Sequence, residues 1–402
     1  MNSIKKLIFI TFITLSSFLN SRETTEQILQ NNEVLMPPIS REEAINWSSI
    51  PFLEEQVQKS MALLQDVTDN RGEEESVKKF LASLRGDHAA LTILPSNGNS
   101  GDAVYKVIDS SKTAVLYIKI MKKDFAEFLP EILGIRLIEM LNLHHLKGVK
   151  IVGVAAYYNK EKNDRYVMIA QTPAYGTTLS KRLETSLALE KGSKERENAF
   201  KNLEKIMYRL GQGLQEFHYA RPALKKVLHP YPEKIYRRTA ERAIRKIQQS
   251  PKYGLKASKV KEKFEESISK LTEIPFTWSF THNDANFDNF LYDENNDTLS
   301  TIDLANTSLS VGRSYTPIGA AAEDVATIYD QITLRKISGL TKKEAKLLKN
   351  AFIDGYQSFG NKVPPQEQID FFLYKIALKR VIKYYGETSN IFLEQTVITL
   401  KS

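Results

Sequence analysis

The chain has 402 residues, of which 42% are hydrophobic, and a formal net charge of +8. This length allows more than one lobe with its own core, and the composition is that of an ordinary globular protein. The chain contains no cysteine, which excludes disulfides, thiolate metal ligands and cysteine-linked lipid anchors.

The first 21 residues differ from the rest of the chain. Lys5 and Lys6 precede a mostly apolar run over 7–19, and the small residue Ser21 stands just before a charged stretch. This layout predicts a secretory signal peptide over 1–21, because the apolar run is short for a membrane span. We therefore expect a secreted or exported protein with no stable membrane span after cleavage; a membrane anchor formed by residues 7–19 is the alternative.

Residues 22–86 are polar and are expected to form a helical extension. Ser40 and Glu43 fit a capping box. Apolar residues then recur at roughly helical spacing, at Phe52, Val57, Met61 and Leu64. A charged link is expected over 66–75, and a further helix over 76–84. No catalytic constellation occurs in this part of the sequence.

A strand-rich segment begins near residue 87. Strands are predicted over 91–94, 103–108, 114–120, 149–158 and 165–169. The turn between the first two contains Gly98, Asn99, Ser100 and Gly101, and a glycine turn lets backbone N–H groups approach a phosphate. Hairpins use such turns constantly, so this turn alone indicates little.

One lysine, Lys119, lies inside the apolar strand predicted over 114–120. A buried ammonium requires a partner, because an unpaired charge is costly in a low-dielectric interior. Lys122 and Lys123 follow the strand and are expected to be solvated. The position of Lys119 therefore indicates a built site rather than a surface charge.

The most informative stretch covers residues 282–289, with the sequence HNDANFDN. An apolar and aromatic run over 274–281 predicts a strand that leads into it. Two short strands are predicted after it, over 290–292 and 298–302, and a polar turn joins them. This hairpin is expected to bring the residues on either side of it to one end of the structure.

Three oxygen-bearing residues flank the hairpin: Asp284, Asn289 and Asp303. Phosphoryl transfer needs magnesium to neutralise phosphate charge and a carboxylate to take the proton of the acceptor hydroxyl. Magnesium prefers oxygen ligands, often only one or two of them from the protein. Asn289 and Asp303 are therefore the candidate metal ligands, and Asp284 is the candidate base. The alternative is that these residues only form turns.

The pattern His-x-Asp-x-x-x-x-Asn followed by Ile-Asp resembles the catalytic and metal loops of the aminoglycoside phosphotransferase and choline kinase superfamily, which has a protein-kinase-like fold. The matching residues are His282, Asp284, Asn289 and Asp303. The family usually has glycine where Asn283 stands, and often His-Pro-Gly where residues 286–288 stand. Neither departure removes a reacting group, but Asp288 adds a charge beside the metal site.

This resemblance implies further roles. Lys119 would hold the α- and β-phosphates of ATP and pair with a helix glutamate. Pro130 is expected to open that helix, which makes Glu131 the preferred partner over Glu127. The segment after residue 169 resembles the hinge that binds adenine. Gln171 and Thr172, together with the turn residues Gly98, Asn99, Ser100 and Gly101, are therefore the expected lining of the nucleotide site.

The later part of the chain contains helical patterns that the resemblance also covers. An apolar stripe at helical spacing predicts a long helix that ends near His218, which we expect to be a structural residue rather than a catalyst. Asp324 matches a family aspartate that opens a helix and braces the catalytic loop. Phe352 and Tyr356 resemble part of a late helix and are expected in the core.

The segment between His218 and His282 resembles the helical acceptor-site insert of the family, at about 219–272, and is too long for the short connection of protein kinases. Residues 221–263 contain fourteen Lys or Arg and three Glu. We therefore expect a small-molecule acceptor, and an anionic one if this charge lines the cleft. A solvated face turned away from the cleft is the alternative. The aromatic residues are too sparse to indicate nucleic-acid binding.

Together these features predict a two-lobed α+β fold of the protein-kinase type. A helical extension (22–86) precedes a small β-rich lobe (87–172) and a larger helical lobe (173–402). The expected activity is phosphorylation of a small-molecule hydroxyl that depends on ATP and Mg²⁺. Two alternatives stay open: a catalytically silent kinase-like binding module, such as an exported effector, and a protein kinase, which the long insert disfavours.

Overall fold

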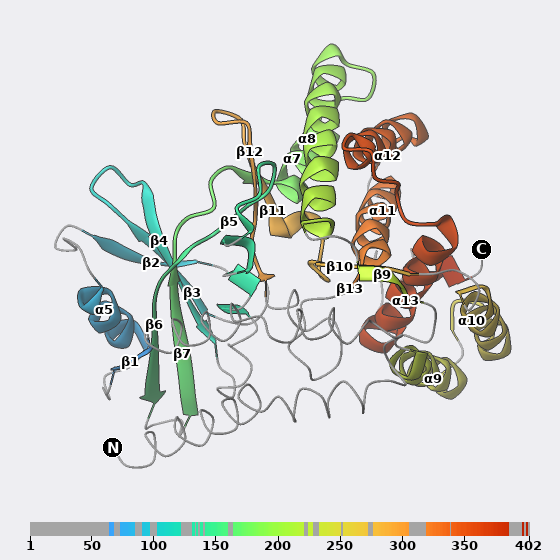
Figure 1. Ribbon diagram of the computed structural model, residues 1–402, viewed down its shortest axis with the longest axis horizontal. Helices are drawn as coiled ribbons and strands as arrows, with labels where there is room; N and C mark the ends of the chain where they lie inside the picture. The colour runs from blue at the N-terminus through green and yellow to red at the C-terminus, as the bar shows by residue number, and fades with distance from the viewer. Residues whose placement is uncertain are drawn as a thin grey trace.

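The structure is a computed structural model (Figure 1). It describes residues 64–67, 73–84, 91–96, 103–121, 131–159, 164–220, 224–227, 233–250, 252–271, 276–304, 319–337, 339–385 and 396–400, apart from the single positions 133, 136, 140 and 398. The signal peptide, the capping box at Ser40 and the turn Gly98–Gly101 of the sequence predictions lie outside these residues. Within this part of the chain, no helix combines the length and the apolar character needed to cross a membrane.

The small lobe is built on a six-stranded sheet with the order β1-β6-β7-β4-β3-β2. Its strands are β1 (Leu64–Val67), β2 (Thr92–Ser96), β3 (Ala103–Ile108), β4 (Ala114–Met121), β6 (Ile151–Asn159) and β7 (Asp164–Gln171). β1 runs parallel to β6, and all other neighbouring pairs are antiparallel. The five strands predicted from the sequence are confirmed, with ends that shift by a residue or two.

Strand β1 corrects one prediction. A helix that includes Leu64 was predicted, but Leu64–Val67 is a strand that pairs with β6. The charged link predicted over 66–75 is also wrong, because helix α5 (Glu73–Ser83) begins inside it. The partner of Leu64 is Val154, so local periodicity could not reveal the strand. The three glutamates that open α5 suit a helix N-terminus, where the helix dipole favours negative charge.

Two layers cover the sheet. Phe80 of α5 shares one core with Ile118 and Met168, whereas Ile132, Ile135 and Ile138 share the other core with Ile169. Side chains alternate along a strand, so Lys119, next to Ile118, points to the second face. This face is the one that carries the candidate site.

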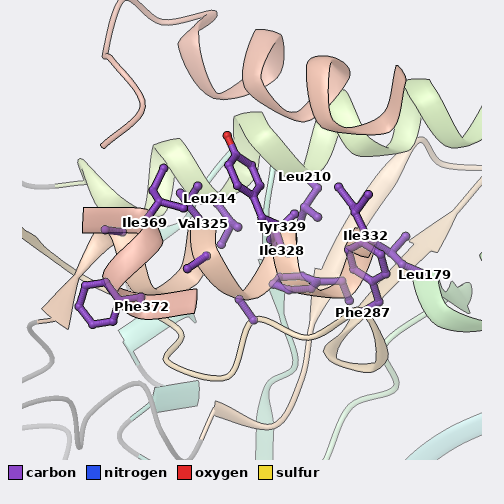
Figure 2. Packing of buried hydrophobic residues seen from close by; sticks show 14 of the residues in the cluster. Leu179, Leu210, Leu214, Phe287, Val325, Ile328, Tyr329, Ile332, Ile369 and Phe372 are labelled. Carbon is purple, nitrogen blue, oxygen red and sulfur yellow. The ribbon is translucent and has the colours of Figure 1, made fainter. Parts of the chain in front are cut away.

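The larger lobe is helical. Its helices are α7 (Leu179–Leu187), α8 (Lys194–His218), α9 (Glu233–Gln249), α10 (Ala257–Leu271), α11 (Ala321–Ile337), α12 (Lys342–Gln357) and α13 (Gln366–Tyr384). α8 is the long helix predicted to end near His218, and its apolar stripe is buried. Figure 2 shows Leu210 and Leu214 of this stripe packed near Val325 and Tyr329 of α11.

Helices α8 and α12 approach each other closely. A Cβ added at Gly355 would lie 2.0 Å from the carbonyl oxygen of Tyr208, and one added at Gly211 would lie 2.2 Å from that of Phe352. Both positions therefore require glycine because a backbone occupies the space. Phe352 and Tyr356 are fully buried, which confirms the prediction for this helix.

Two small sheets hold the two ends of the loop over 280–289. In the first sheet, β10 (Phe276–Ser279) lies between β9 (Leu224–Val227) and β13 (Gly319–Ala320). In the second sheet, β11 (Phe290–Asp293) and β12 (Thr298–Thr301) form the predicted hairpin. Strand β8 (Thr177–Thr178) pairs with β11, and strand β5 (Lys147–Gly148) pairs with β12. β9 was not predicted, because it is a four-residue strand inside an otherwise helical insert. The remainder of the insert contains the expected helices, α9 and α10.

Candidate functional site

The loop between β10 and β11 is fixed by the core beneath it. Phe287 is 1% exposed, and Figure 2 shows it beside Ile328 and Ile332 of α11. Asn286 caps the 3₁₀ helix Phe287–Asn289, since its side-chain oxygen accepts a hydrogen bond from the N–H of Asp288 at 3.0 Å. An apolar anchor and a local side-chain cap therefore determine the shape of this loop.

Asp324 braces the start of the loop from below. Its fully buried carboxylate accepts hydrogen bonds from the N–H groups of His282, at 2.7 Å, and Asn283, at 2.8 Å. It also lies 3.0 Å from Nε2 of His218, whose Nδ1 is 2.7 Å from the hydroxyl of Tyr356. The bracing role predicted for Asp324 is confirmed, and His218 serves this brace as a structural residue.

Asn283 replaces the glycine that the resembled family usually has, and its backbone shows why either residue fits. Its φ is +60°, in the left-handed region. Glycine adopts this conformation freely, and asparagine tolerates it better than most other residues. The departure from the family pattern therefore leaves the loop conformation intact.

Asp284 is held by two amide side chains of its own loop. Asn289 donates through Nδ2 to the backbone carbonyl of Asp284, at 2.8 Å, and to its Oδ2, at 3.2 Å. Asn286 donates through Nδ2 to its Oδ1, at 3.0 Å. The NH₂ group of Asn289 is therefore occupied by Asp284. The other end of the same amide, Oδ1 of Asn289, accepts no hydrogen bond from any described residue. This oxygen is free to bind a cation.

The hairpin places Asp303 beside Asn289. Phe290 pairs with Thr301 at the start of the hairpin, and the N–H of Ile302 donates to the carbonyl of Asn289 at 3.0 Å. His282 holds the same end of β12, with Nε2 lying 2.9 Å from Oγ1 of Thr301. Asp303 follows directly, with a φ of +56° that turns its backbone out of the strand.

Lys119 reaches this end of the hairpin from the small lobe. Its Nζ lies 3.1 Å from Oδ1 of Asp303 and 3.5 Å from Oε2 of Glu131. Lys119 is 9% exposed and Glu131 is 1% exposed, so the pair is buried, as a lysine inside a strand requires. Of the two glutamates considered from the sequence, the structure places Glu131 beside the lysine; Glu127 lies outside the described residues.

The end of the site near the hinge contains Gln171 and Thr172. The N–H of Thr172 donates to the carbonyl of Lys150 at 2.8 Å, and its hydroxyl accepts from the N–H of Lys150 at 2.9 Å. These two groups therefore fix the chain path rather than remaining free for a ligand. Gln171 is the last residue of β7, and the register pairs it with Tyr117 of β4.

Tyr117 is a candidate that the sequence analysis missed. It stands two positions before Lys119 on β4, so both side chains lie on the same face of the sheet. It is half-buried, and burial raises the pKa of its hydroxyl above the usual value. The alternation of side chains along the strand was the signal that could have identified it.

The donor set suits a sparse magnesium site. The described residues contain no group of three or more His, Cys, Asp or Glu side chains arranged to hold a metal. Magnesium does not require one, because it usually keeps waters and substrate phosphates and takes only one or two protein oxygens. The Asn289 amide oxygen and the Asp303 carboxylate match this requirement.

The basic insert directs much of its charge outward. Arg237 of α9 forms an ion pair with Glu265 of α10, with Nη1 and Oε1 2.8 Å apart. Arg238 and Arg242 are exposed on the helix face opposite the buried Ala240. Exposure fits both a solvated face and an acceptor-binding face, so the anionic acceptor stays a prediction.

Comparisons with known proteins bear on the fold. No family model and no curated protein matches the chain. Among solved structures, crystal form B of a glucosamine kinase has a TM-score of 0.55 at 10% identity and covers 83% of this chain and 82% of its own. A glucosamine kinase in complex with glucosamine, ADP and inorganic phosphate has a TM-score of 0.53 at 12% identity, with 82% of each chain covered.

A choline kinase from Cryptosporidium parvum Iowa II has a TM-score of 0.47 at 14% identity, covering 82% of this chain and 93% of its own. This similarity is too weak to support a conclusion. The glucosamine kinase structures confirm the predicted two-lobed fold of the protein-kinase type. At such low identity they establish the fold alone, and the chemistry has to be argued from the site.

Proposed function

We propose that this protein, with its protein-kinase-like fold, transfers the terminal phosphate of magnesium-bound ATP to a hydroxyl of a small molecule. The observation that carries the proposal is the contact of Lys119 with Asp303, at 3.1 Å, next to a loop in which Asn289 holds Asp284. The lysine comes from a part of the sequence that is distant from the carboxylates and the amide. The structural neighbours are small-molecule phosphotransferases, which supports the same class of reaction.

Lys119, Asn289 and Asp303 are proposed to bind the nucleotide. Lys119 would contact the phosphates, and Glu131 holds its side chain in place from within the small lobe. Asn289 and Asp303 would hold Mg²⁺, which neutralises phosphate charge in this reaction. Positioning and charge neutralisation account for most of the catalysis in phosphoryl transfer, so a set of few but well-held groups is sufficient.

Asp284 is proposed to take the proton of the acceptor hydroxyl. The amides of Asn286 and Asn289 each bind one of its carboxylate oxygens, which fixes the orientation of the group. The brace from Asp324 fixes the backbone of the two preceding residues. A base held in this way acts on a hydroxyl that is bound beside it, and this contribution is typically 10²- to 10⁴-fold in rate.

The acceptor is proposed to be a small molecule rather than a protein. Helices α9 and α10 occupy the insert between α8 and the catalytic loop, where protein kinases have only a short connection. An anionic acceptor was expected from the basic charge of this insert. Glu265 already neutralises Arg237, whereas Arg238 is exposed, so the proposal covers acceptors of either charge.

The test is turnover of ATP and Mg²⁺ by the purified protein across a panel of hydroxyl-bearing metabolites. Asp284→Asn is expected to lower the rate by about 10²- to 10⁴-fold. Asp354→Asn is the matched control, because it makes the same change at an exposed residue of α12 that takes no part in the proposed site. A rate unaffected by Asp284→Asn would reject the assigned base. Nucleotide binding without turnover of any acceptor would favour the silent binding module.

A further inference from the structure

Gln171 carries a buried polar atom that the fold does not satisfy. Its side-chain Oε1 is buried and has no hydrogen-bond partner in the part of the chain that the structure describes. Its amide nitrogen has no partner among the described residues either. Buried polar groups in folded proteins are almost always paired, so an exception at the edge of a candidate site indicates a ligand.

The sheet register shows which way this side chain faces. Gln171 lies opposite Tyr117 on β4, and directly opposed residues of neighbouring strands share a face. Tyr117 and Lys119 are two positions apart, so the face of Gln171 is also the face of Lys119. From the strand rise and the strand spacing, the Cα atoms of Gln171 and Lys119 lie about 8 Å apart across the sheet.

On the sheet face that carries Lys119, a nucleotide can extend from the lysine in one direction only, toward Tyr117 and Gln171. Met121, on the far side of Lys119 from Tyr117, is 3% exposed and belongs to the core. Tyr117 and Gln171 are only half-buried. With its phosphates at Lys119, a nucleotide therefore extends its base toward these two residues. The neighbouring N–H and hydroxyl of Thr172 are already bound to Lys150, which leaves the Gln171 amide uncommitted beside the base.

We propose that Gln171 binds the hydrogen-bonding edge of the nucleobase, and that the site accepts 6-amino and 6-oxo purines alike. An amide offers an acceptor at one end and donors at the other, and rotation about its last bond exchanges the two. No described residue holds the group in either orientation. Oε1 accepts from the 6-amino group of ATP, and Nε2 donates to the 6-oxo group of GTP. This inference rests on the proposed function and extends its donor from ATP to GTP.

The experiment is isothermal titration calorimetry of MgATP and MgGTP with the wild type, Gln171→Glu and Gln171→Met. It is done at pH 8, so that the introduced carboxylate is ionised. The wild type is expected to bind the two nucleotides within about tenfold of each other. Gln171→Glu retains acceptors only, which repel the 6-oxo group of GTP but can accept from the neighbouring N1–H, so the ratio of ATP to GTP affinity should change by roughly tenfold or more. Gln171→Met removes donor and acceptor together and should weaken both nucleotides by a similar factor.

Two controls separate binding from folding. Gln357→Glu makes the same change on the exposed face of α12 and should leave the ratio of the two affinities unchanged. The thermal midpoint of each variant is measured alongside, and the ratio of the two affinities within one variant cancels any loss of folded protein. Gln171→Met provides the second variant if the glutamate proves destabilising.

The outcomes distinguish this inference from the proposed function. A ratio of ATP to GTP affinity that Gln171→Glu leaves unchanged would overturn the role of Gln171. A wild type that binds one purine nucleotide and rejects the other would overturn the dual acceptance. A wild type that binds neither nucleotide contradicts the proposed function itself, on which the inference depends.

Discussion

The ammonium group of Lys119 lies 3.1 Å from the carboxylate of Asp303, although 184 positions separate the two residues in the sequence. Lys119 belongs to the sheet of the small lobe, and Asp303 follows the hairpin of the larger lobe. This contact joins the lobes at the place where nucleotide phosphates are proposed to bind. The positive charge of Lys119, proposed to bind phosphate, and the negative charge of Asp303, proposed to bind the metal, therefore lie side by side.

The first prediction concerns the brace that Asp324 forms beneath the loop over 282–289. Asp324→Asn replaces a carboxylate that accepts from two N–H groups and lies against His218, so a buried donor would be left without its acceptor. We expect the free energy of unfolding to fall by about 2–5 kcal/mol. Urea unfolding measures it, with Asp354→Asn on the exposed face of α12 as the control. Equal midpoints for the two variants would show that Asp324 is no brace.

A second prediction tests the contact between α8 and α12. The added Cβ of Gly355→Ala would lie 2.0 Å from the carbonyl oxygen of Tyr208, so the two helices must separate. Overpacking of this kind costs about 1–3 kcal/mol of stability. Gln357→Ala, two positions later and exposed, is the control and should be nearly neutral. A urea midpoint for Gly355→Ala equal to that of the wild type would contradict the close packing.

A third prediction concerns pH. Burial acts to raise the pKa of the Glu344 carboxyl, but hydrogen bonds from Arg196 and Thr341 and the charge of the guanidinium outweigh it and lower the pKa from 4.5 to about 2. A lowered pKa in the folded state stabilises the fold above pH 4.5, and this contribution is lost as the pH falls from 4.5 toward 2. Its full size is about 3 kcal/mol.

The measurement compares the wild type with Glu344→Gln by urea unfolding at pH 7 and pH 3. The difference in the free energy of unfolding should be largest at pH 7 and should shrink at pH 3. An exposed pair, Glu266 and Lys270 of α10, provides the control, because Glu266→Gln should change little at either pH. A difference for Glu344→Gln that is the same at both pH values would rule out the lowered pKa.

The central hairpin was predictable because its signals are local. The strands on either side of a polar turn, and the spacing of Asp284, Asn289 and Asp303 around them, lie within a short stretch of sequence. Lys119 was identifiable for a similar reason, since a charge inside an apolar strand requires a partner. The bracing by Asp324 was inferred from a family resemblance rather than from physical pattern alone.

The elements that escaped prediction depend on distant partners. β1 exists because Leu64–Val67 pairs with β6, and β9 because it pairs with β10. Neither strand is long enough to show a period of its own. The same applies to Thr172, whose N–H and hydroxyl are bound to Lys150; only the folded chain shows that they are occupied. Tyr117 was within reach of the sequence, through strand alternation.

The account depends most on Asp303 and Asn289 holding magnesium for a nucleotide bound beneath Lys119. Titration calorimetry of ATP with the wild type and with Asp303→Asn, each with and without Mg²⁺, tests this claim directly. We expect Mg²⁺ to tighten ATP binding to the wild type by roughly tenfold or more, and Asp303→Asn to lose most of this gain, since magnesium takes only one or two ligands from the protein. An affinity for ATP that is indifferent to Mg²⁺ in the wild type, or a gain that survives intact in Asp303→Asn, would contradict it.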